Sequence, residues 1–367
     1  TSFCDVRPEV AAFEPYEPGL SIAEIAERYG LSRVIKMASN ENPLGVSPRV
    51  RDVIASCASE VFRYPQSGNP RLVKALASHY GVDAGRIFVG NGSDEVIDLL
   101  FRVRAVPGVH NAVVFRPCFG LYPTQARMAG VELRQAPLRP DFSFDFDGLL
   151  KLADENTTLV IVTSPDNPSG RIASPDELEA LARALPPACL LVVDEAYIEF
   201  AGPEHSVLSR LDRLPNVAVM RTFSKVYGLA GLRIGYAVLP AAIADYMWRV
   251  RLPFSLNVLA EEAALAALAD GQFRERTVEL VQRGRAKLTE ELRNMGCEVS
   301  PSMSNFVMFC LPEGTTDAAT LHGELLKRGI IIRALASYHL PDRLRVSVGT
   351  DEENELFLRN TKEIMGV

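Results

Sequence analysis

The most informative stretch of this sequence is Thr222-Phe-Ser-Lys-Val-Tyr-Gly-Leu-Ala-Gly-Leu-Arg233. It directly follows Val217–Arg221, an apolar run that is typical of a buried strand. A lysine at a strand end and beside glycines can be buried in a tight cleft, where desolvation lowers its pKa and makes the amine nucleophilic. Ser224 and Arg233 could then bind one phosphate group between them. The alternative for Lys225 is a solvated loop lysine, because charged side chains are usually exposed.

Similar apolar runs precede this stretch and alternate, from about residue 70, with segments of helical periodicity. This alternation indicates strands joined by crossover helices, and near-continuous hydrophobicity indicates strands that are covered on both faces. The sequence therefore predicts an α/β fold with a mostly parallel sheet, which presents ligands with the carboxyl ends of its strands. The expected strands are Ile87–Val89, Ala112–Phe115, Leu159–Thr163, Leu190–Val193, Val217–Arg221 and Ile234–Val238.

A change of pattern after roughly residue 245 predicts a second domain. Long helical segments come first and shorter apolar runs follow, so we expect a large domain over residues 48–245 and a smaller α+β domain over 246–367. Residues 1–47 are expected to form an N-terminal arm and part of the small domain. The elements expected outside the large domain are helices at Ile22–Tyr29, Leu259–Ala269, Phe273–Met295 and 317–328, and strands at Asn305–Cys310 and Arg343–Val348.

Composition favours a small-molecule partner. The net charge of −7 argues against nucleic acid or an anionic membrane, which need a basic face. No apolar run approaches the ~20 residues of a membrane span, and acidic residues near the start argue against a secretory signal. The six cysteines form no C-x-x-C pair, which indicates reduced thiols and no metal site. We therefore expect a cytoplasmic protein.

A second motif, Val193-Asp-Glu-Ala-Tyr197, also ends an apolar strand. An aspartate in this place can face the protonated nitrogen of a pyridine ring, and the ion pair keeps the ring electron-withdrawing. Tyr197 follows three residues later and could reach a phenolic oxygen on the same ring. The alternative for Asp194 is a strand-ending carboxylate that caps the next turn.

A third motif, Thr163-Ser-Pro-Asp-Asn-Pro-Ser-Gly170, is a turn after another expected strand. Turns of this composition are common in plain loops. The amide of Asn167 could nevertheless donate a hydrogen bond to the phenolic oxygen of a cofactor ring.

A fourth motif, Gly90-Asn-Gly-Ser-Asp-Glu95, opens a helical stretch. A glycine turn at a helix start presents free N–H groups and the positive end of the helix dipole to an anion. Because the Asp94 carboxylate would repel a phosphate, we assign phosphate contacts to the backbone of Gly92, Ser93 and Asp94 and to the Ser93 hydroxyl. The same residues also suit a plain helix cap.

In chain order, the four motifs supply phosphate donors, a donor to a phenolic oxygen, a partner for a pyridinium and a nucleophilic lysine. Together they resemble the fold-type-I aminotransferases, which use pyridoxal 5'-phosphate (PLP), and within these the histidinol-phosphate aminotransferase family. The resemblance implies a large PLP-binding domain and a smaller α+β domain. Further matching segments are Tyr16-Glu-Pro-Gly19, Ala38-Ser-Asn-Glu-Asn-Pro-Leu-Gly45, Arg63-Tyr-Pro65, Asn305-Phe306 and Leu344-Arg-Val-Ser-Val-Gly-Thr350.

The resemblance implies that Lys225 holds PLP as a Schiff base and moves the reacting proton. It places Phe119 against the cofactor ring. Tyr64 would reach the cofactor phosphate of a neighbouring subunit, which implies a homodimer with shared active sites. Arg345 would grip the substrate carboxylate through a planar, bidentate fork, and Arg333 would contact the substrate phosphate. The remaining residues assigned by resemblance are Thr222 at the cofactor and Tyr16 and Asn42 at the substrate.

The implied reaction is ping-pong transfer of an amino group between glutamate and imidazole acetol phosphate, which yields histidinol phosphate and 2-oxoglutarate. An aromatic-amino-acid aminotransferase and a PLP decarboxylase acting on threonine phosphate are alternatives. A PLP-dependent regulator is a further one, although residues 1–48 are too short and too acidic for a DNA-binding domain. A dinucleotide-binding dehydrogenase would need a G-x-G-x-x-G after the first strand, and the sequence has none there.

Overall fold

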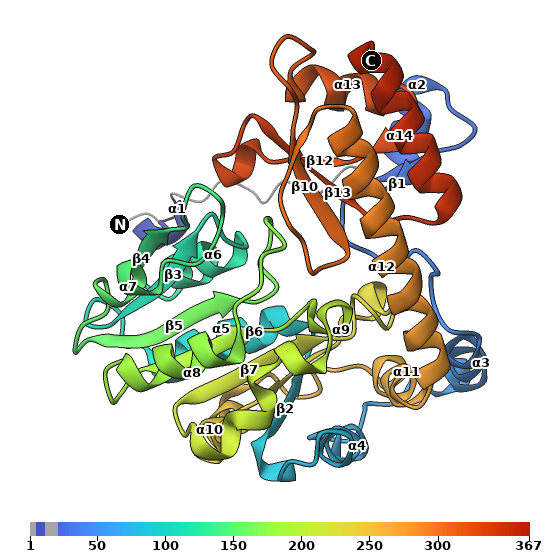
Figure 1. Ribbon diagram of the computed structural model, residues 1–367. Coiled ribbons are helices and arrows are strands. Elements are labelled where there is room, and N and C mark those ends of the chain that lie inside the picture. Colours follow the sequence, from blue (N-terminus) through green and yellow to red (C-terminus); the bar gives the residue numbers. More distant parts are fainter. Residues whose placement is uncertain (1–4, 12–20) are drawn as a thin grey trace.

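The central sheet of the protein has seven strands (Figure 1). The computed structural model describes residues 5–11 and 21–367. In chain order the strands of this sheet are β2 (Ile87–Gly90), β3 (Asn111–Arg116), β4 (Glu132–Pro137), β5 (Thr157–Thr163), β6 (Leu190–Asp194), β7 (Val217–Thr222) and β8 (Gly235–Val238). Their spatial order is β2-β8-β7-β6-β5-β3-β4. All neighbours pair in parallel except β8, which runs antiparallel to both β7 and β2, so the predicted mostly parallel sheet is confirmed.

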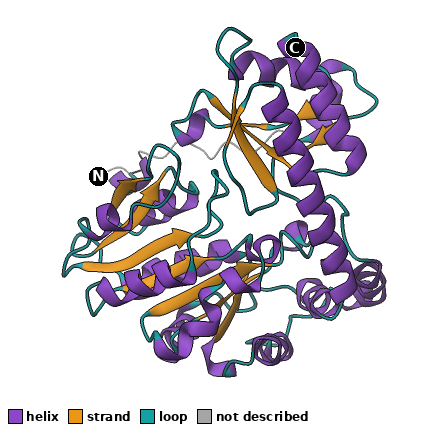
Figure 2. Ribbon diagram, viewed as in Figure 1, coloured by secondary structure: helices purple, strands orange, loops and turns teal. Residues whose placement is uncertain are grey.

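Both faces of this sheet are buried, as the apolar runs predict. Along β5, Val160 and Val162 pack into one core cluster, whereas Leu159 and Ile161 pack into another on the opposite face. Helices cover the two faces (Figure 2). Those in the cluster of Leu159 are α5 (Ser93–Arg104), α6 (Leu121–Met128) and α10 (Ala241–Val250), and those in the cluster of Val160 include α4 (Pro70–Tyr80), α8 (Pro175–Ala184) and α11 (Val258–Leu268).

Strand β4 was not among the expected strands. Its sequence, Glu-Leu-Arg-Gln-Ala-Pro, buries only Ala136, and it pairs with β3 alone at the edge of the sheet. An edge strand needs few apolar residues, because one of its sides has no neighbouring strand. The hydrophobic pattern that marks the central strands is therefore absent from β4.

The small domain is built on a four-stranded antiparallel sheet of order β12-β13-β10-β9. A short parallel pair, β1 (Ile35–Lys36) with β11 (Ile330–Ile331), brings the N-terminal arm into this domain. The four strands are β9 (Glu298–Val299), β10 (Phe306–Cys310), β12 (Arg333–Ala334) and β13 (Arg343–Ser347), and the accompanying helices are α2 (Ile22–Tyr29), α13 (Ala318–Lys327) and α14 (Asp351–Met365).

The expected boundary between the domains, at residue 245, falls inside α10. Helix α10 contacts α5 and β2, and α11 contacts α3 (Pro48–Cys57) and α4, so both helices pack with the large domain. The long helix α12 (Gly271–Asn294) then runs upward to the small domain (Figure 1). We therefore propose that the division lies within α12.

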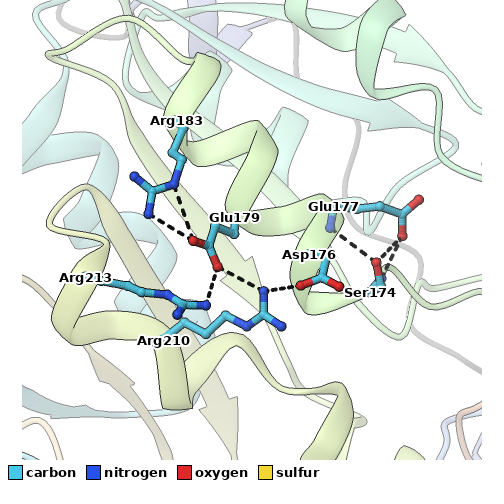
Figure 3. Close-up of polar contacts among 7 residues, drawn as sticks. All are labelled: Ser174, Asp176, Glu177, Glu179, Arg183, Arg210 and Arg213. Atoms are coloured by element: carbon cyan, nitrogen blue, oxygen red, sulfur yellow. Dashed lines mark hydrogen bonds and ion pairs between the residues drawn. The ribbon is translucent and has the colours of Figure 1, made fainter.

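Ion pairs join α8 to the segment Val207–Arg213 (Figure 3). Ser174 and Glu177 form a capping box at the start of the helix, which satisfies two of its free N–H groups. One turn later the Glu179 carboxylate accepts hydrogen bonds from three arginines, and these lower its pKa to about 2. The three are Arg183, Arg210 and Arg213.

The other helices of the described chain are short: α1 (Pro8–Ala11), α7 (Phe146–Leu150) and α9 (Ile198–Ala201). Helix α1 contacts α6, and the Arg7 guanidinium donates to the Met128 carbonyl at 3.2 Å. Within residues 5–11 and 21–367, none of the helices has both the length and the apolar character needed to cross a membrane.

Candidate active site

A cavity of about 230 Å³ lies where β5, β6 and β7 end. These strands are parallel neighbours, and Thr163 is the register partner of Asp194, so the side chains that follow them meet at one edge of the sheet. The predicted site residues in the cavity wall are Ser93, Asp94, Phe119, Asn167, Asp194, Tyr197, Thr222, Ser224, Lys225 and Arg233. The wall also contains Ser39, Glu41, Thr163, Ala196 and Ala230.

Lys225 lies in this wall, just beyond the end of β7. Its Nζ donates to the Ser39 carbonyl at 3.2 Å and lies 5.7 Å from the centre of the Tyr197 ring. Burial lowers the pKa of Lys225 to about 8, and the positive charge of Arg345 acts in the same direction. A large fraction of the amine is therefore neutral near pH 8, which makes it a good nucleophile.

Asp194 ends β6 and is only 5% exposed. Burial raises its pKa to about 6, and a hydrogen bond from the Tyr122 hydroxyl, at 2.6 Å, opposes that rise. Sequence reasoning missed Tyr122. The sequence feature that could have pointed to Tyr122 is its position one helical turn after Phe119. The two rings pack edge to face with centroids 5.8 Å apart.

Two donors point their protons toward the cavity because other residues hold their acceptor sides. The Oδ1 atom of Asn167 accepts from the Arg345 guanidinium, which leaves the amide nitrogen as the group available to a ligand. The Tyr197 hydroxyl accepts from the Asn40 amide at 3.0 Å and so keeps its own proton for donation. Asn40 was not singled out from the sequence. Its positive φ of 56° suits asparagine, which tolerates the left-handed region.

The start of α5 lies in the cavity wall and has free N–H groups that suit an anion. Its N-cap, Gly92, has no side chain to cap the first N–H groups of the helix. The Arg233 guanidinium donates to Ser224 Oγ at 3.4 Å and to Asp94 Oδ2 at 3.0 Å, so the Asp94 carboxylate is already paired. A Cβ atom at Gly235 would lie 2.1 Å from the Ser93 nitrogen, and this glycine is therefore what lets the helix start approach β8.

Thr222 shapes the turn that precedes the lysine. Its hydroxyl accepts the Ser224 N–H at 3.0 Å and donates to the Ile234 carbonyl at 3.3 Å. The side chain thus fixes the backbone between β7 and Lys225.

Two arginines lie directly opposite each other on β12 and β13. Arg333 and Arg345 are register partners, so their side chains leave the same face of the small-domain sheet. Arg345 is 5% exposed and donates to Asn167 and to the Ala38 carbonyl, but its buried Nε has no partner in the described part of the chain. Like charges in this arrangement repel, and an anion between them would relieve the repulsion. The arginine pair is thus suited to an anionic substrate.

Five of the predicted residues that the structure describes are not in the cavity wall: Gly92, Arg333 and Arg345, which are placed above, and Asn42 and Tyr64. Asn42 was expected at the substrate, but it does not line the cavity. Its amide donates to the Val226 carbonyl at 2.8 Å and to Thr277 at 3.3 Å, so it joins the N-terminal arm to the loop that follows Lys225. Tyr64 also lies outside the cavity wall and is 82% exposed. Tyr16 falls outside the described residues.

A second cavity, of about 480 Å³, lies between α4, α9 and α12 and contains none of the predicted site residues. Arg221 in its wall is already paired with the buried Glu195 carboxylate at 2.8 Å. The second cavity is larger, but the Lys225 cavity is the better candidate site, because its wall combines a nucleophile, a buried carboxylate and oriented hydrogen-bond donors.

Comparison with known proteins agrees with this geometry. The profile of the family described as aminotransferase class I and II matches residues 32–360. Histidinol-phosphate aminotransferase from Nitratidesulfovibrio vulgaris strain Hildenborough is 59% identical over 98% of this chain and 96% of its own length. The same-named protein of Oleidesulfovibrio alaskensis is 58% identical over 98% of this chain and 95% of its own.

A solved structure shows the same architecture. Histidinol-phosphate aminotransferase from Sinorhizobium meliloti, crystallised in complex with pyridoxal-5'-phosphate, superposes with a TM-score of 0.90 at 28% identity, covering 100% of this chain and 99% of that one. The chain belongs to the aminotransferase class I and II family and, within it, to the histidinol-phosphate aminotransferases.

Proposed function

We propose that this protein is a PLP-dependent aminotransferase that exchanges an amino group between histidinol phosphate and 2-oxoglutarate, with imidazole acetol phosphate and glutamate as the products. The observation that carries the proposal is the arrangement around Lys225, a buried amine with a lowered pKa that shares one cavity with Asp194, Asn167 and Tyr197. The reaction runs in either direction, and histidine synthesis would use the direction that consumes glutamate.

The cavity residues fit each part of PLP. The uncapped start of α5, Ser224 and Arg233 suit its phosphate. Asp194 suits the ring nitrogen, and Asn167 and Tyr197, with their donors aimed at the cavity, suit the phenolic oxygen. Lys225 suits the aldehyde carbon. When bound, PLP supplies an electron-withdrawing ring that weakens the Cα–H bond of the amino acid attached to it.

Residues of the chain perform the other steps. As a free base, Lys225 Nζ would take the proton from the Cα of the substrate and deliver it to the carbon on the other side of the transferred nitrogen. Arg345 holds the α-carboxylate of glutamate through its unpartnered Nε and a neighbouring N–H group. Arg333, opposite it, serves the phosphate of histidinol phosphate and the side-chain carboxylate of glutamate in turn.

Steady-state kinetics separate this reaction from its alternatives. The enzyme loaded with PLP would be given histidinol phosphate, phenylalanine or threonine phosphate, with 2-oxoglutarate as the acceptor. We expect the highest kcat/KM with histidinol phosphate. A preference for phenylalanine would make the protein an aromatic-amino-acid aminotransferase, and release of CO₂ from threonine phosphate would make it a decarboxylase.

The proposal includes a homodimer whose two subunits share each active site. Tyr64, which the family resemblance assigns to the partner's cofactor phosphate, is exposed and stacks on Phe254 with ring centroids 4.8 Å apart. Apolar side chains close to these two residues in the sequence are also exposed, namely Val61 at 61%, Phe62 at 73% and Leu252 at 72%. Exposed apolar groups gathered in this way are typical of a subunit interface.

A cytoplasmic location is also proposed, supported by the five free cysteines of the described chain.

A further inference from the structure

We propose that Tyr122 is a positioning residue that keeps Asp194 ionised and aims its carboxylate at the ring nitrogen of the cofactor. This inference rests on the proposed function, because it concerns the group that would face the bound ring. It adds a residue of α6 to a site whose other polar groups come from strand ends, from the start of α5 and from the N-terminal arm.

A chain of two hydrogen bonds leads to Asp194. The Tyr122 hydroxyl lies 2.6 Å from Asp194 Oδ2 and 2.8 Å from Thr163 Oγ1, and all three side chains are buried. An ionised carboxylate can only accept, so the single proton of the tyrosine goes to Asp194 and Thr163 donates to the tyrosine oxygen. Bonds in such a chain strengthen one another, because each donor is polarised by the bond that it accepts.

Asp194 needs this support because its other charged neighbours oppose ionisation. Burial raises the pKa of Asp194, and the nearby Asp94 and Glu195 carboxylates raise it further. Two neutral donors act against these effects: the Tyr122 hydroxyl, and the Ala196 N–H, which donates to Oδ1 at 3.1 Å. Each donor holds one carboxylate oxygen, so together they also fix the plane of the carboxylate.

The Tyr122 ring also packs in the core, so an experiment must distinguish the effect of its hydrogen bond from the effect of its packing. Its ring is 1% exposed, belongs to the core cluster of α5 and α6, and contacts the edge of Phe119. The substitution Tyr122→Phe retains the ring and removes only the hydroxyl. Tyr236 is a matched control, since it is equally buried at 1% and its hydroxyl bonds to Tyr80 at 2.5 Å, away from Asp194.

The experiment compares wild type, Tyr122→Phe and Tyr236→Phe by PLP affinity and by pH titration of the visible absorption band of the PLP-loaded enzymes. Without the hydroxyl, Asp194 retains a proton more readily and the ring nitrogen loses its positive charge. The nitrogen that links the lysine to the cofactor then becomes more basic. We expect the titration midpoint of Tyr122→Phe to move to higher pH and its PLP dissociation constant to rise about 10-fold, as for other bonds to charged groups. Tyr236→Phe should match the wild type in both measurements.

Thr163 provides a second test that leaves the tyrosine in place. Thr163→Val removes the donor to Tyr122 and should shift the midpoint in the same direction by a smaller amount, whereas Thr163→Ser keeps the hydroxyl and should restore the wild-type value. A wild-type midpoint in both Tyr122→Phe and Thr163→Val would overturn the inference while leaving the proposed function intact. Failure of the wild type to bind PLP would overturn both.

Discussion

Arg345 links strand β13 of the small domain to the wall of the Lys225 cavity. One of its N–H groups fixes the orientation of the Asn167 amide, another holds the Ala38 carbonyl, and its buried Nε has no partner in the described part of the chain. The same positive charge helps to lower the pKa of Lys225. A single side chain thus acts on both Lys225 and Asn167, and in the proposed site it would also hold the substrate carboxylate.

The lowered pKa of Lys225 predicts how fast the cofactor attaches. Only the neutral amine reacts with an aldehyde, and burial lowers the pKa from 10.5 to about 8. The rate of PLP attachment to the cofactor-free protein, followed by absorbance, should therefore rise with pH up to about 8 and then level off. Lys225→Ala should show no such phase. A rate that keeps climbing above pH 10 would show an ordinary, solvated lysine.

Replacing Arg345 with lysine should impair substrate binding more than folding. Lysine keeps the charge but loses the planar fork, so it cannot hold Asn167, Ala38 and a carboxylate at the same time. We expect the KM for glutamate to rise about 10- to 100-fold, with a smaller fall in kcat from the freed Asn167 amide. Arg343→Lys is the matched control, because Arg343 lies on the same strand and pairs with Glu298 at 3.1 Å. Equal kinetic losses in both variants would contradict the role given to Arg345.

Among the individual elements, those whose sequence carries a strong pattern could be predicted. Strands β5 and β6 each contain four consecutive apolar residues because both of their faces are covered, and the residues that follow them therefore could be placed at one edge of the sheet. Tyr122 and Asn40 could not be found in this way. Their partners lie on segments 72 and 157 residues away, and no local pattern encodes such contacts.

The charge cluster at α8 contributes stability that depends on pH. The three arginines around Glu179 lower the pKa of its carboxyl from 4.5 to about 2, so the ionised form is favoured by the folded protein. This contribution is complete above pH 4.5 and is lost as the pH falls toward 2. Glu179→Gln should lower the free energy of unfolding by urea at pH 7, and its difference from the wild type should shrink below pH 4.5. The exposed Glu313 gives a control, Glu313→Gln, with little effect at either pH. A Glu179→Gln deficit that is the same at pH 7 and pH 3 would exclude the ion pairs as its source.

At the scale of the whole molecule, the sequence supports the fold class and the presence of a large and a small domain, whereas the boundary that it predicts at residue 245 differs from the one proposed within α12. The helical pattern after residue 245 suggests a new domain, although α10 and α11 belong to the layer that covers the large sheet. Helical periodicity shows that one face of a helix is buried, and it does not show which domain buries that face. Arg333 and Arg345, the two arginines proposed to bind the substrate, likewise become a pair only through the register of β12 with β13.

Shared active sites predict that two inactive variants can restore each other. In a mixed dimer of Lys225→Ala and Tyr64→Ala subunits, one site carries both substitutions and the other carries none. Random reassociation after mild denaturation should therefore return about a quarter of the wild-type activity, because half of the dimers are mixed and each has one intact site. The separately treated variants are the controls. Mixtures no more active than these controls would mean that Tyr64 serves its own subunit or none.

The most direct test of the central claim is to locate the covalent cofactor. The protein would be incubated with PLP, reduced with borohydride, digested and examined by mass spectrometry, beside the Lys225→Ala variant treated in the same way. We predict one pyridoxyl group per chain in the wild type, on the peptide that contains Lys225. The variant should carry no peptide labelled to a comparable extent. Reduction that leaves Lys225 unmodified, or equal labelling of the variant at other lysines, would contradict the claim that this lysine anchors the cofactor.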